Sequence, residues 1–148
     1  IAVAGSESIP GGLINQMPIR PEGAPPEQGI LVDSMIGDHD LINALGAELI
    51  QGRNFSMTFP TDSMEAVIFN ESAVKLMGWQ DDPLDKEIVV FQNWKHAKVV
   101  GVVEDFHHKS LHQPIEPLFL HITPSYELFI IRTRTLQHLG CRTCDFDH

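Results

Sequence analysis

The highest density of titratable side chains lies between residues 104 and 112. It comprises two acids and three histidines, namely Glu104, Asp105, His107, His108 and His112. On a helix, His108 and His112 would stand one turn apart, the spacing at which two imidazoles share a zinc ion. Pro114 discourages such a helix, and zinc sites use three or four converging protein ligands. We therefore interpret the segment as a turn with exposed histidines, and a zinc-dependent hydrolase that uses His107, His108 and His112 is the least favoured alternative.

Cys141 and Cys144 form a second candidate, because they have the CxxC spacing of redox motifs and zinc half-sites. A redox CxxC opens a helix whose N-terminus lowers the thiol pKa, but no strand-helix pattern surrounds this pair. His138 and His148 lie close enough in sequence to join the cysteines in adventitious metal capture. Since chain ends that nothing ties down are usually disordered, we predict an atypical, disordered tail over residues 135–148.

Nucleophilic catalysis and phosphate binding find little support elsewhere in the chain. No GxSxG nucleophile motif occurs, and Ser110 beside the histidines is a local cluster, whereas catalytic triads bring together distant residues. Neither Gly5-Ser6 nor Gly11-Gly12 opens a helix after a strand, as phosphate-binding loops do. The residues thus indicate a domain without a convincing catalytic or cofactor-binding site.

The charge balance excludes further classes of function. Twenty Asp and Glu residues against ten Lys and Arg give the 148-residue chain a formal net charge of -10. Nucleic-acid binding depends on a basic stripe, so no nucleic-acid partner is expected. No apolar run approaches the roughly 20 residues that cross a bilayer. Because the chain begins at Ile1 without a methionine, we interpret it as a piece of a longer protein.

Short apolar runs separated by turn signals predict many strands and few helices. The expected strands cover residues 1–8, 13–21, 29–35, 47–55, 66–69, 86–91, 95–104, 118–122 and 127–134, and the expected helices cover residues 38–45 and 70–77. Pro18 and Pro21 indicate that the second strand lies at a sheet edge, and residues 56–65 are expected to form a loop. The predicted fold class is α+β, with mixed sheets of about eight short strands and two or three short helices.

Three segments, taken in order, resemble a known family. They are LGAELIQGRNFS at 45–56, then AVIFNESA at 66–73 with LMGW at 76–79 and DPL at 82–84, then VVGVVEDFH at 99–107 with SLH at 110–112 and PIEPL at 114–118. In this order and spacing they resemble the extracytoplasmic core domain of MacB/FtsX-like ABC transporter permeases, particularly the version abundant in Bacteroidetes. The opening SESIPG at 6–11 fits the same pattern, so the resemblance runs from residue 1 to about residue 133.

The resemblance implies a core domain over residues 1–134, built from a porter-like lobe and an inserted β-rich lobe at about residues 12–62. In that family the domain lies between the first two transmembrane helices of an efflux or export permease in the inner (cytoplasmic) membrane, on the periplasmic side. It relays ATP-driven motion to substrates or partner proteins and is not an enzyme. The implied partners are the other permease subunit, the ATPase of the same transporter and a periplasmic adaptor. ATP belongs to a separate cytoplasmic subunit, and this domain needs no cofactor.

Structural roles account for the motif residues. These residues are Gly52, Arg53, Asn70, Glu71, Gly78, Asp105, Phe106, Pro114 and Pro117. We expect a positive-φ turn at Gly52, an ion pair between Arg53 and Asp62 or Glu71, and a helix cap at Asn70. Gly78 is expected to stop the same helix, and the two prolines fix the path into the next strand.

Two features depart from the family pattern, and one further function stays open. Asp85 stands where the family usually has Gly after Asp-Pro-Leu, so the turn there is expected to differ in conformation. Beyond Arg134 the sequence no longer follows the family. The alternative function is a free-standing periplasmic binding or sensor domain of the same fold, which would require a deep apolar pocket with a few polar groups.

Overall fold

The computed structural model describes residues 2–6, 14–79, 81–90, 95–109, 112–122, 128–132 and 137–140. These residues contain ten short strands and four short helical segments. The strands are β1 (Ala2–Ser6), β2 (Asn15–Pro21), β3 (Ile30–Gly37), β4 (Leu49–Gly52), β5 (Ala66–Asn70), β6 (Glu87–Val90), β7 (Lys95–Val103), β8 (Leu118–Ile122), β9 (Leu128–Arg132) and β10 (Gln137–Gly140). The helices are η1 (Pro26–Gln28), α1 (Leu41–Leu45), α2 (Asp62–Glu65) and α3 (Glu71–Leu76). None of these helices has the length and apolar character needed to cross a membrane.

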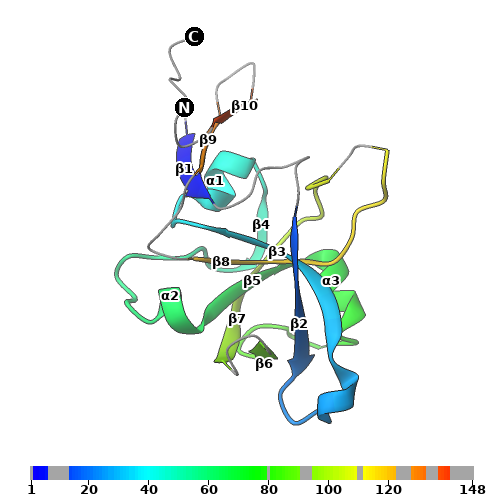
Figure 1. The fold of residues 1–148 in the computed structure, drawn as a ribbon. Coiled ribbons are helices and arrows are strands. Elements are labelled where there is room, and N and C mark those ends of the chain that lie inside the picture. The colour runs from blue at the N-terminus through cyan, green and yellow to red at the C-terminus, as the bar shows by residue number, and fades with distance from the viewer. Residues whose placement is uncertain are drawn as a thin grey trace.

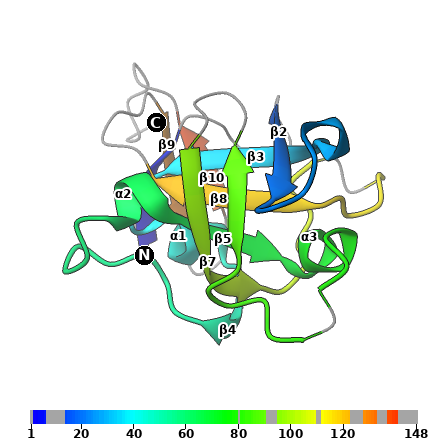
Figure 2. The ribbon, with the colours of Figure 1, turned by 90° about the horizontal axis from the view of Figure 1, so that it is seen from below.

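Six of the strands close into a barrel. In hydrogen-bonding order they are β3, β2, β6, β7, β5 and β8, and the parallel pairing of β8 with β3 completes the ring. The β5–β7 pair is also parallel, while the remaining pairs of the ring are antiparallel. Figure 2 shows the barrel from below, where β3 and β8 run horizontally and β7 runs vertically. The α+β class and the mixed sheet are confirmed, and the closure adds what strand periodicity did not predict.

Apolar side chains from all six barrel strands meet in one cluster, which fills the interior. Its buried members are Ile19, Val32, Val67, Phe69, Ala73, Ile88, Val90, Ala97, Val99, Val102 and Phe119. The helix α3 joins this core, since Ala73 is a member and Val74 packs against it. Trp79 follows the helix and stacks on Phe69 with ring centroids 5.7 Å apart. Burial of such side chains contributes about 1.5–3 kcal/mol each.

The outer faces of β3, β5 and β8 carry a second apolar cluster, which α1 and β1 cover. Its buried members are Ala4, Met35, Leu41, Ile42, Ala44, Leu45, Phe55, Ala66, Ile68, Val103, Leu118, Leu120 and Ile122. Successive strand residues face opposite sides, so Ile68 and Phe69 of β5 belong to different clusters. Beyond the barrel the sheet continues from β3 through β1 to β9 and β10, and Figure 1 shows these last three strands beside α1.

The predicted edge position of β2 is wrong. β2 lies between β3 and β6, and these two neighbours share its length: β3 pairs with residues 15–19 and β6 with residues 19–21. Pro18 therefore lies in the half that only β3 pairs, and Pro21 is the last residue of the strand. A strand with partners on both sides tolerates prolines at such positions because few ladder hydrogen bonds are lost.

Two other segments depart from the sequence predictions. Residues 56–65, expected to be a loop, contain the four-residue helix α2, which a chain of turns leads into: the Phe59 amide donates to the Ser56 carbonyl at 3.2 Å and the Asp62 amide to the Phe59 carbonyl at 3.0 Å. Within the predicted tail, residues 137–140 form β10, which pairs with β9. Residues 141–148 lie outside the described residues, and the division into 1–134 and 135–148 stays a prediction.

The strands predicted at 86–91 and 95–104 correspond to β6 and β7, which pair antiparallel from Glu87 opposite Lys98 to Val90 opposite Lys95. In the turn before β6, Asp85 has a φ of 64° and its amide donates to the Val99 carbonyl at 2.9 Å. Aspartate is among the residues that tolerate this left-handed region. The same conformation is open to glycine, so Asp85 does not by itself require a different turn.

Candidate functional site

The connection between β7 and β8 carries the histidines and much of the third sequence motif. It spans residues 104–117, of which 104–109 and 112–117 are described. Side chains of β3, of α3 and of the β5–α3 junction hold it on the barrel through polar contacts. Ser110 lies outside the described residues, as do Cys141 and Cys144.

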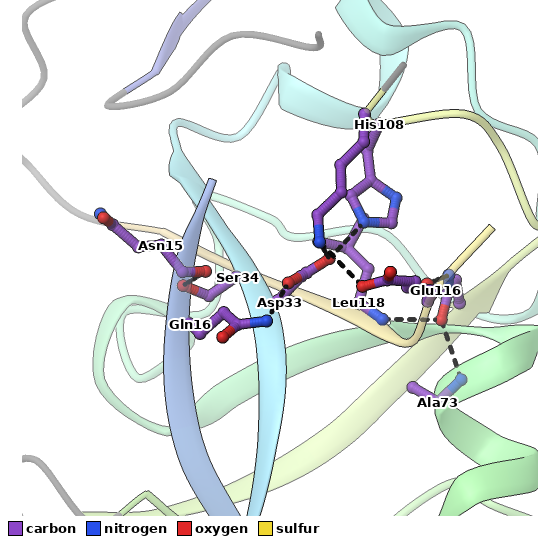
Figure 3. A network of polar contacts seen from close by, with 10 residues as sticks. Asn15, Gln16, Asp33, Ser34, Ala73, His108, Glu116 and Leu118 are labelled. Atoms are coloured by element: carbon purple, nitrogen blue, oxygen red, sulfur yellow. Dashed lines mark hydrogen bonds and ion pairs between the residues drawn. The ribbon is translucent and has the colours of Figure 1, made fainter. Parts of the chain in front are cut away.

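Asp33 of β3 is the centre of the first group of contacts (Figure 3). Its Oδ2 lies 2.8 Å from Nε2 of His108 and 3.0 Å from Nζ of Lys109. Its Oδ1 accepts a hydrogen bond at 3.0 Å from Nε2 of Gln16 in β2. Lys109 Nζ also contacts Oε2 of Glu116 at 2.8 Å. The contacts of Asp33 and Lys109 together thus join two barrel strands to both halves of the connection.

Asp33 stays charged in spite of its burial. The side chains of Asp33 and His108 are each only 1% exposed. Burial by itself raises the pKa of Asp33, but hydrogen bonds from His108, Gln16 and Lys109 outweigh it and hold that pKa below its usual value. The hydrogen bond to Glu116 is the main cause that raises the pKa of Lys109. Because an unpaired buried charge costs several kcal/mol, this set of partners fixes where the connection lies.

The Asp33–His108 pair resembles the carboxylate–imidazole pairs of hydrolases in its geometry, but its burial argues for a structural role. A catalytic imidazole contacts substrate, whereas both of these side chains are sealed from solvent. Nδ1 of His108 is buried and has no hydrogen-bond partner among the described residues. The prediction of exposed histidines holds for His107 and His112 and is wrong for His108. In the described part of the chain, neither His108 nor His112 belongs to a group of three converging metal ligands.

Asp105 and the start of α3 exchange hydrogen bonds in both directions. The Asp105 carboxylate accepts from the Ser72 amide at 2.9 Å and from the Ser72 hydroxyl at 2.8 Å. In return, Oε1 of Glu71 accepts from the Asp105 amide at 3.1 Å. These contacts satisfy an amide of the first helical turn, which has no partner within the helix. Glu71 is therefore engaged with Asp105, which leaves Asp62 as the partner of Arg53.

Asn70 joins three elements at the junction of β5 and α3. Its Oδ1 accepts from the Ala73 amide at 2.9 Å, which is the predicted helix cap, and also from the Leu118 amide of β8 at 3.0 Å. Its Nδ2 donates to the Glu116 carbonyl at 2.9 Å. The side chain is fully buried, so all three bonds replace contacts with water.

The turn after β4 is built on Gly52, whose φ is 72°. A Cβ atom at this position would lie 2.2 Å from the Val100 carbonyl oxygen of β7. Contacts this short do not occur between real atoms, so the close approach of β4 to β7 requires glycine. The amide of the next residue, Arg53, donates to the same Val100 carbonyl at 3.0 Å, and its side chain reaches Asp62 at the start of α2.

Arg53 makes a two-pronged ion pair with Asp62. Nη1 lies 2.8 Å from Oδ2 and Nη2 lies 2.8 Å from Oδ1, and the Arg53 guanidinium also stands 4.3 Å from the centre of the Phe59 ring. Oδ2 of Asp62 accepts in addition from the Ser56 amide at 2.9 Å. Burial alone raises the pKa of Asp62, but the bonds from Arg53 and Ser56 prevail and lower it. The loop between β4 and α2 is thereby closed on itself.

The remaining motif residues lie around these contacts. Gly78, with a φ of 72°, follows the end of α3. The Phe106 ring meets the His108 ring edge-on, with centroids 5.9 Å apart. The Pro117 carbonyl accepts from the Asp33 amide at 3.3 Å, while Pro114 is exposed.

Comparison with known proteins gives no match to a protein-family profile or to a curated protein sequence. Solved structures do match. The periplasmic region of MacB from Actinobacillus actinomycetemcomitans aligns with a TM-score of 0.59 and 17% identity over 81% of this chain and 47% of that one. The extracellular domain of the noncanonic ABC-type transporter YknZ from Gram-positive bacteria aligns at 0.57 and 13% over 82% and 54%. A domain of a permease protein from Porphyromonas gingivalis aligns at 0.54 and 18% over 82% and 48%. This chain has the MacB-type periplasmic fold.

The MacB-type fold explains why three motifs that are separate in sequence occur together. β4 pairs with β7, β7 pairs with β5, and β5 pairs with β8, so the three segments become neighbours. The chain spans about half the length of the matched structures, from 47% to 54%. The structural matches confirm the sequence resemblance at the level of the fold.

Sequence reasoning missed three residues that anchor the connection in this MacB-type fold, namely Asp33, Lys109 and Glu116. A signal for Asp33 was present, because it is a charged residue within the otherwise apolar strand Ile30–Gly37. A charge in a buried strand requires a partner. No comparable local signal marks Lys109 or Glu116, whose partners come from a distant strand or from across the connection.

Proposed function

We propose that this chain is a non-catalytic, extracytoplasmic domain of an ABC-type export permease. In this proposal the parent protein is embedded in the cytoplasmic membrane and the domain faces the periplasm. It relays ATP-driven motion of the membrane helices to substrates or partner proteins there. ATP is bound by a separate cytoplasmic subunit, and the domain itself holds no nucleotide or organic cofactor. Its partners are the second permease subunit, the ATPase and a periplasmic adaptor.

The observation that carries this proposal is the fold shared with the periplasmic and extracellular domains of MacB and YknZ. Fold alone does not determine function. The contacts of the buried polar side chains give the proposal a second line of support. Four buried polar or charged side chains, Asp33, Asp62, Asn70 and His108, are engaged in holding segments together. A relay needs such rigid joints, whereas an enzyme needs reactive groups that substrate can reach.

The mechanical side of the proposal rests on the barrel and its connection. A closed ring of strands deforms little because each strand is paired on both sides. The connection that leads from β7 to β8 is fixed to the ring by Asp33 and Asn70, so it moves with the barrel as one body. The division into a porter-like lobe and an insert at about residues 12–62 belongs to the same proposal.

The reading frame on both sides of the coding segment tests the proposal directly. We expect one membrane-spanning helix upstream and three downstream in the same frame. A frame that instead begins with a secretory signal peptide and encodes no membrane helix would contradict the permease and favour a free-standing periplasmic domain. If the helices are present, the full-length protein should co-purify with an ATPase subunit from mild detergent, and failure to do so under conditions that retain a known permease complex would count against the relay.

A further inference from the structure

Three side chains that the proposed function does not use converge on the outer surface of the barrel. They are Glu22, which directly follows β2, Glu87 of β6 and His96 of β7. One carboxylate oxygen of each glutamate and one ring nitrogen of His96 all lie within 4.8 Å of one another. Among the described residues no other group of three metal-ligating side chains converges in this way. The group lies apart from the Asp33 network and from the histidines of the connection.

The barrel fixes the backbone positions of all three residues. The Glu22 amide donates to the Glu87 carbonyl at 3.0 Å, so β2 and β6 are held together at this level. β6 and β7 pair with His96 opposite Val89 and Lys98 opposite Glu87. Ile88 of β6 and Ala97 of β7 point into the barrel interior. Because successive strand residues face opposite sides, the side chains of Glu87 and His96 next to them lie on the outer face, together with Glu22. Glu22 at the end of β2, Glu87 of β6 and His96 of β7 are thus brought together by the pairing of adjacent strands.

The charges in this group are poorly compensated from within. One carboxylate oxygen of Glu22 and one of Glu87 lie within 4.8 Å of each other. Among the described side chains, Nδ1 of His96 lies 3.7 Å from Oε1 of Glu22 and Nζ of Lys98 lies 3.8 Å from Oε1 of Glu87, and both distances exceed hydrogen-bonding distance. Normal N–H···O bonds measure about 2.7–3.2 Å. Two carboxylates therefore face each other beside an imidazole, without a closely bound cation.

We propose that Glu22, Glu87 and His96 bind one divalent transition-metal ion of the zinc class on the outer face of the barrel. Two carboxylate oxygens and an imidazole nitrogen match the donors that zinc prefers, whereas magnesium and calcium prefer oxygen donors alone. In tetrahedral zinc sites neighbouring donor atoms lie about 3.3 Å apart, as metal–donor distances near 2.0–2.1 Å require. Rotation of the exposed Glu22 side chain and the half-buried Glu87 side chain closes the remaining gap. Water takes the fourth position.

Such an ion would act as a clip across three strands of the barrel. It binds the folded chain and not the unfolded one, so it raises stability by mass action as its free concentration exceeds the dissociation constant. Lys98 competes with the ion for Glu87, because its ammonium group lies 3.8 Å from a Glu87 carboxylate oxygen. The ligands lie on the barrel wall and are held by strand pairing. The existence of the site does not depend on the transport function proposed above.

Zinc titration by calorimetry, with the full 148-residue chain free of any histidine tag, tests the site. Because Cys141 and Cys144 offer thiolate ligands of their own, the titration uses the Cys141→Ser/Cys144→Ser variant as background. We expect one zinc ion per chain and no heat of binding with magnesium. His96→Ala and Glu22→Gln should each weaken zinc binding by more than the 10–100-fold that changes around a metal site typically cause. Lys98→Met should strengthen it.

His107→Ala is the matched control, since His107 is also an exposed histidine but lies on the connection. It should leave the zinc affinity within twofold of the background. Zinc affinity that is unchanged by both His96→Ala and Glu22→Gln, or no zinc binding at all, overturns the proposal. As a readout without substitution at the site, zinc should shift the ring-nitrogen NMR resonances of one histidine, and assignment of that ring to any residue other than His96 also overturns it.

Discussion

Asp33 and His108 are 75 residues apart in the sequence, and their side chains meet at 2.8 Å in the interior of the protein. Neither side chain is more than 1% exposed. The contact links β3, one of the two strands whose pairing closes the barrel, to the connection that leads into the other, β8. A single buried contact between two side chains therefore stands at the point where the ring is completed.

Replacing Asp33 by Asn should destabilise the protein by about 3 kcal/mol at neutral pH, because it removes the charge that faces Lys109 and one of the two buried oxygens that contact Gln16, His108 and Lys109. The folded-state pKa of Asp33 lies below its ordinary value of 3.8. Its contribution is therefore present above that value and is lost as the pH falls through the folded pKa. In urea unfolding, the free energy of unfolding should therefore fall less between about pH 5 and pH 2 in the variant than in the parent protein.

His107→Ala is the control for this comparison, because His107 is exposed and precedes the buried histidine directly. Its unfolding free energy should stay within about 0.5 kcal/mol of the parent. An Asp33→Asn variant with the same pH dependence as the parent would contradict the role of this carboxylate.

Asn70→Ala should cost about 2–4 kcal/mol, more than the 0.5–2 kcal/mol of a helix cap alone. The reason is that the Leu118 amide and the Glu116 carbonyl also lose their partner in a buried place. Asn70→Asp keeps the acceptor for the Ala73 and Leu118 amides and loses only the donor, so its loss should be intermediate. Urea unfolding measures both. Equal losses in the two variants would show that the accepted hydrogen bonds contribute little.

Arg53→Met should destabilise the protein by about 1–2 kcal/mol, because Asp62 is buried and would keep only the Ser56 amide as a donor. The estimate is modest because Arg53 is itself 39% exposed. Lys86→Met is the matched control, since the Lys86–Asp81 pair is exposed and its atoms are 3.4 Å apart; it should cost less than about 0.5 kcal/mol. Denaturant midpoints of the two variants that coincide would refute this ranking.

Gly52→Ala and Gly78→Ala separate backbone strain from steric overlap. Both glycines have a φ of 72°, so both variants should lose about 1 kcal/mol to the left-handed conformation. At Gly78 nothing lies within 4 Å of the added carbon, whereas at Gly52 it meets the Val100 carbonyl at 2.2 Å. We expect Gly52→Ala to cost about 2–4 kcal/mol in total. Thermal unfolding that ranks the two variants equally would argue against the close approach of β4 to β7.

The parts of the fold that sequence reasoning predicted are those with local causes. Strand periodicity, the cap at Asn70 and the turn at Gly52 each depend on residues a few positions apart. The ion pair of Arg53 with Asp62 spans only nine residues and was one of two predicted options.

The closure of the barrel and the anchoring of the connection were not predicted, because both depend on distant pairings. Residues 33–37 of β3 pair with residues 118–122 of β8. The alternation of apolar and polar residues along a strand does not indicate which strands become its neighbours. The error about β2 has the same origin: prolines mark positions without a donor, but only the register shows that these positions lie where β2 lacks a second partner.

The closed ring also bears on how copies of this domain behave at high concentration. A strand that is paired on both sides offers no template on which a second chain can add. Among the described strands, β4 and β10 lie at edges of the sheet and are only four residues long, β1 pairs with β3 only at Ser6, and residues 15–18 of β2 pair with β3 alone. Edge-to-edge pairing between copies would therefore have to start from these short stretches.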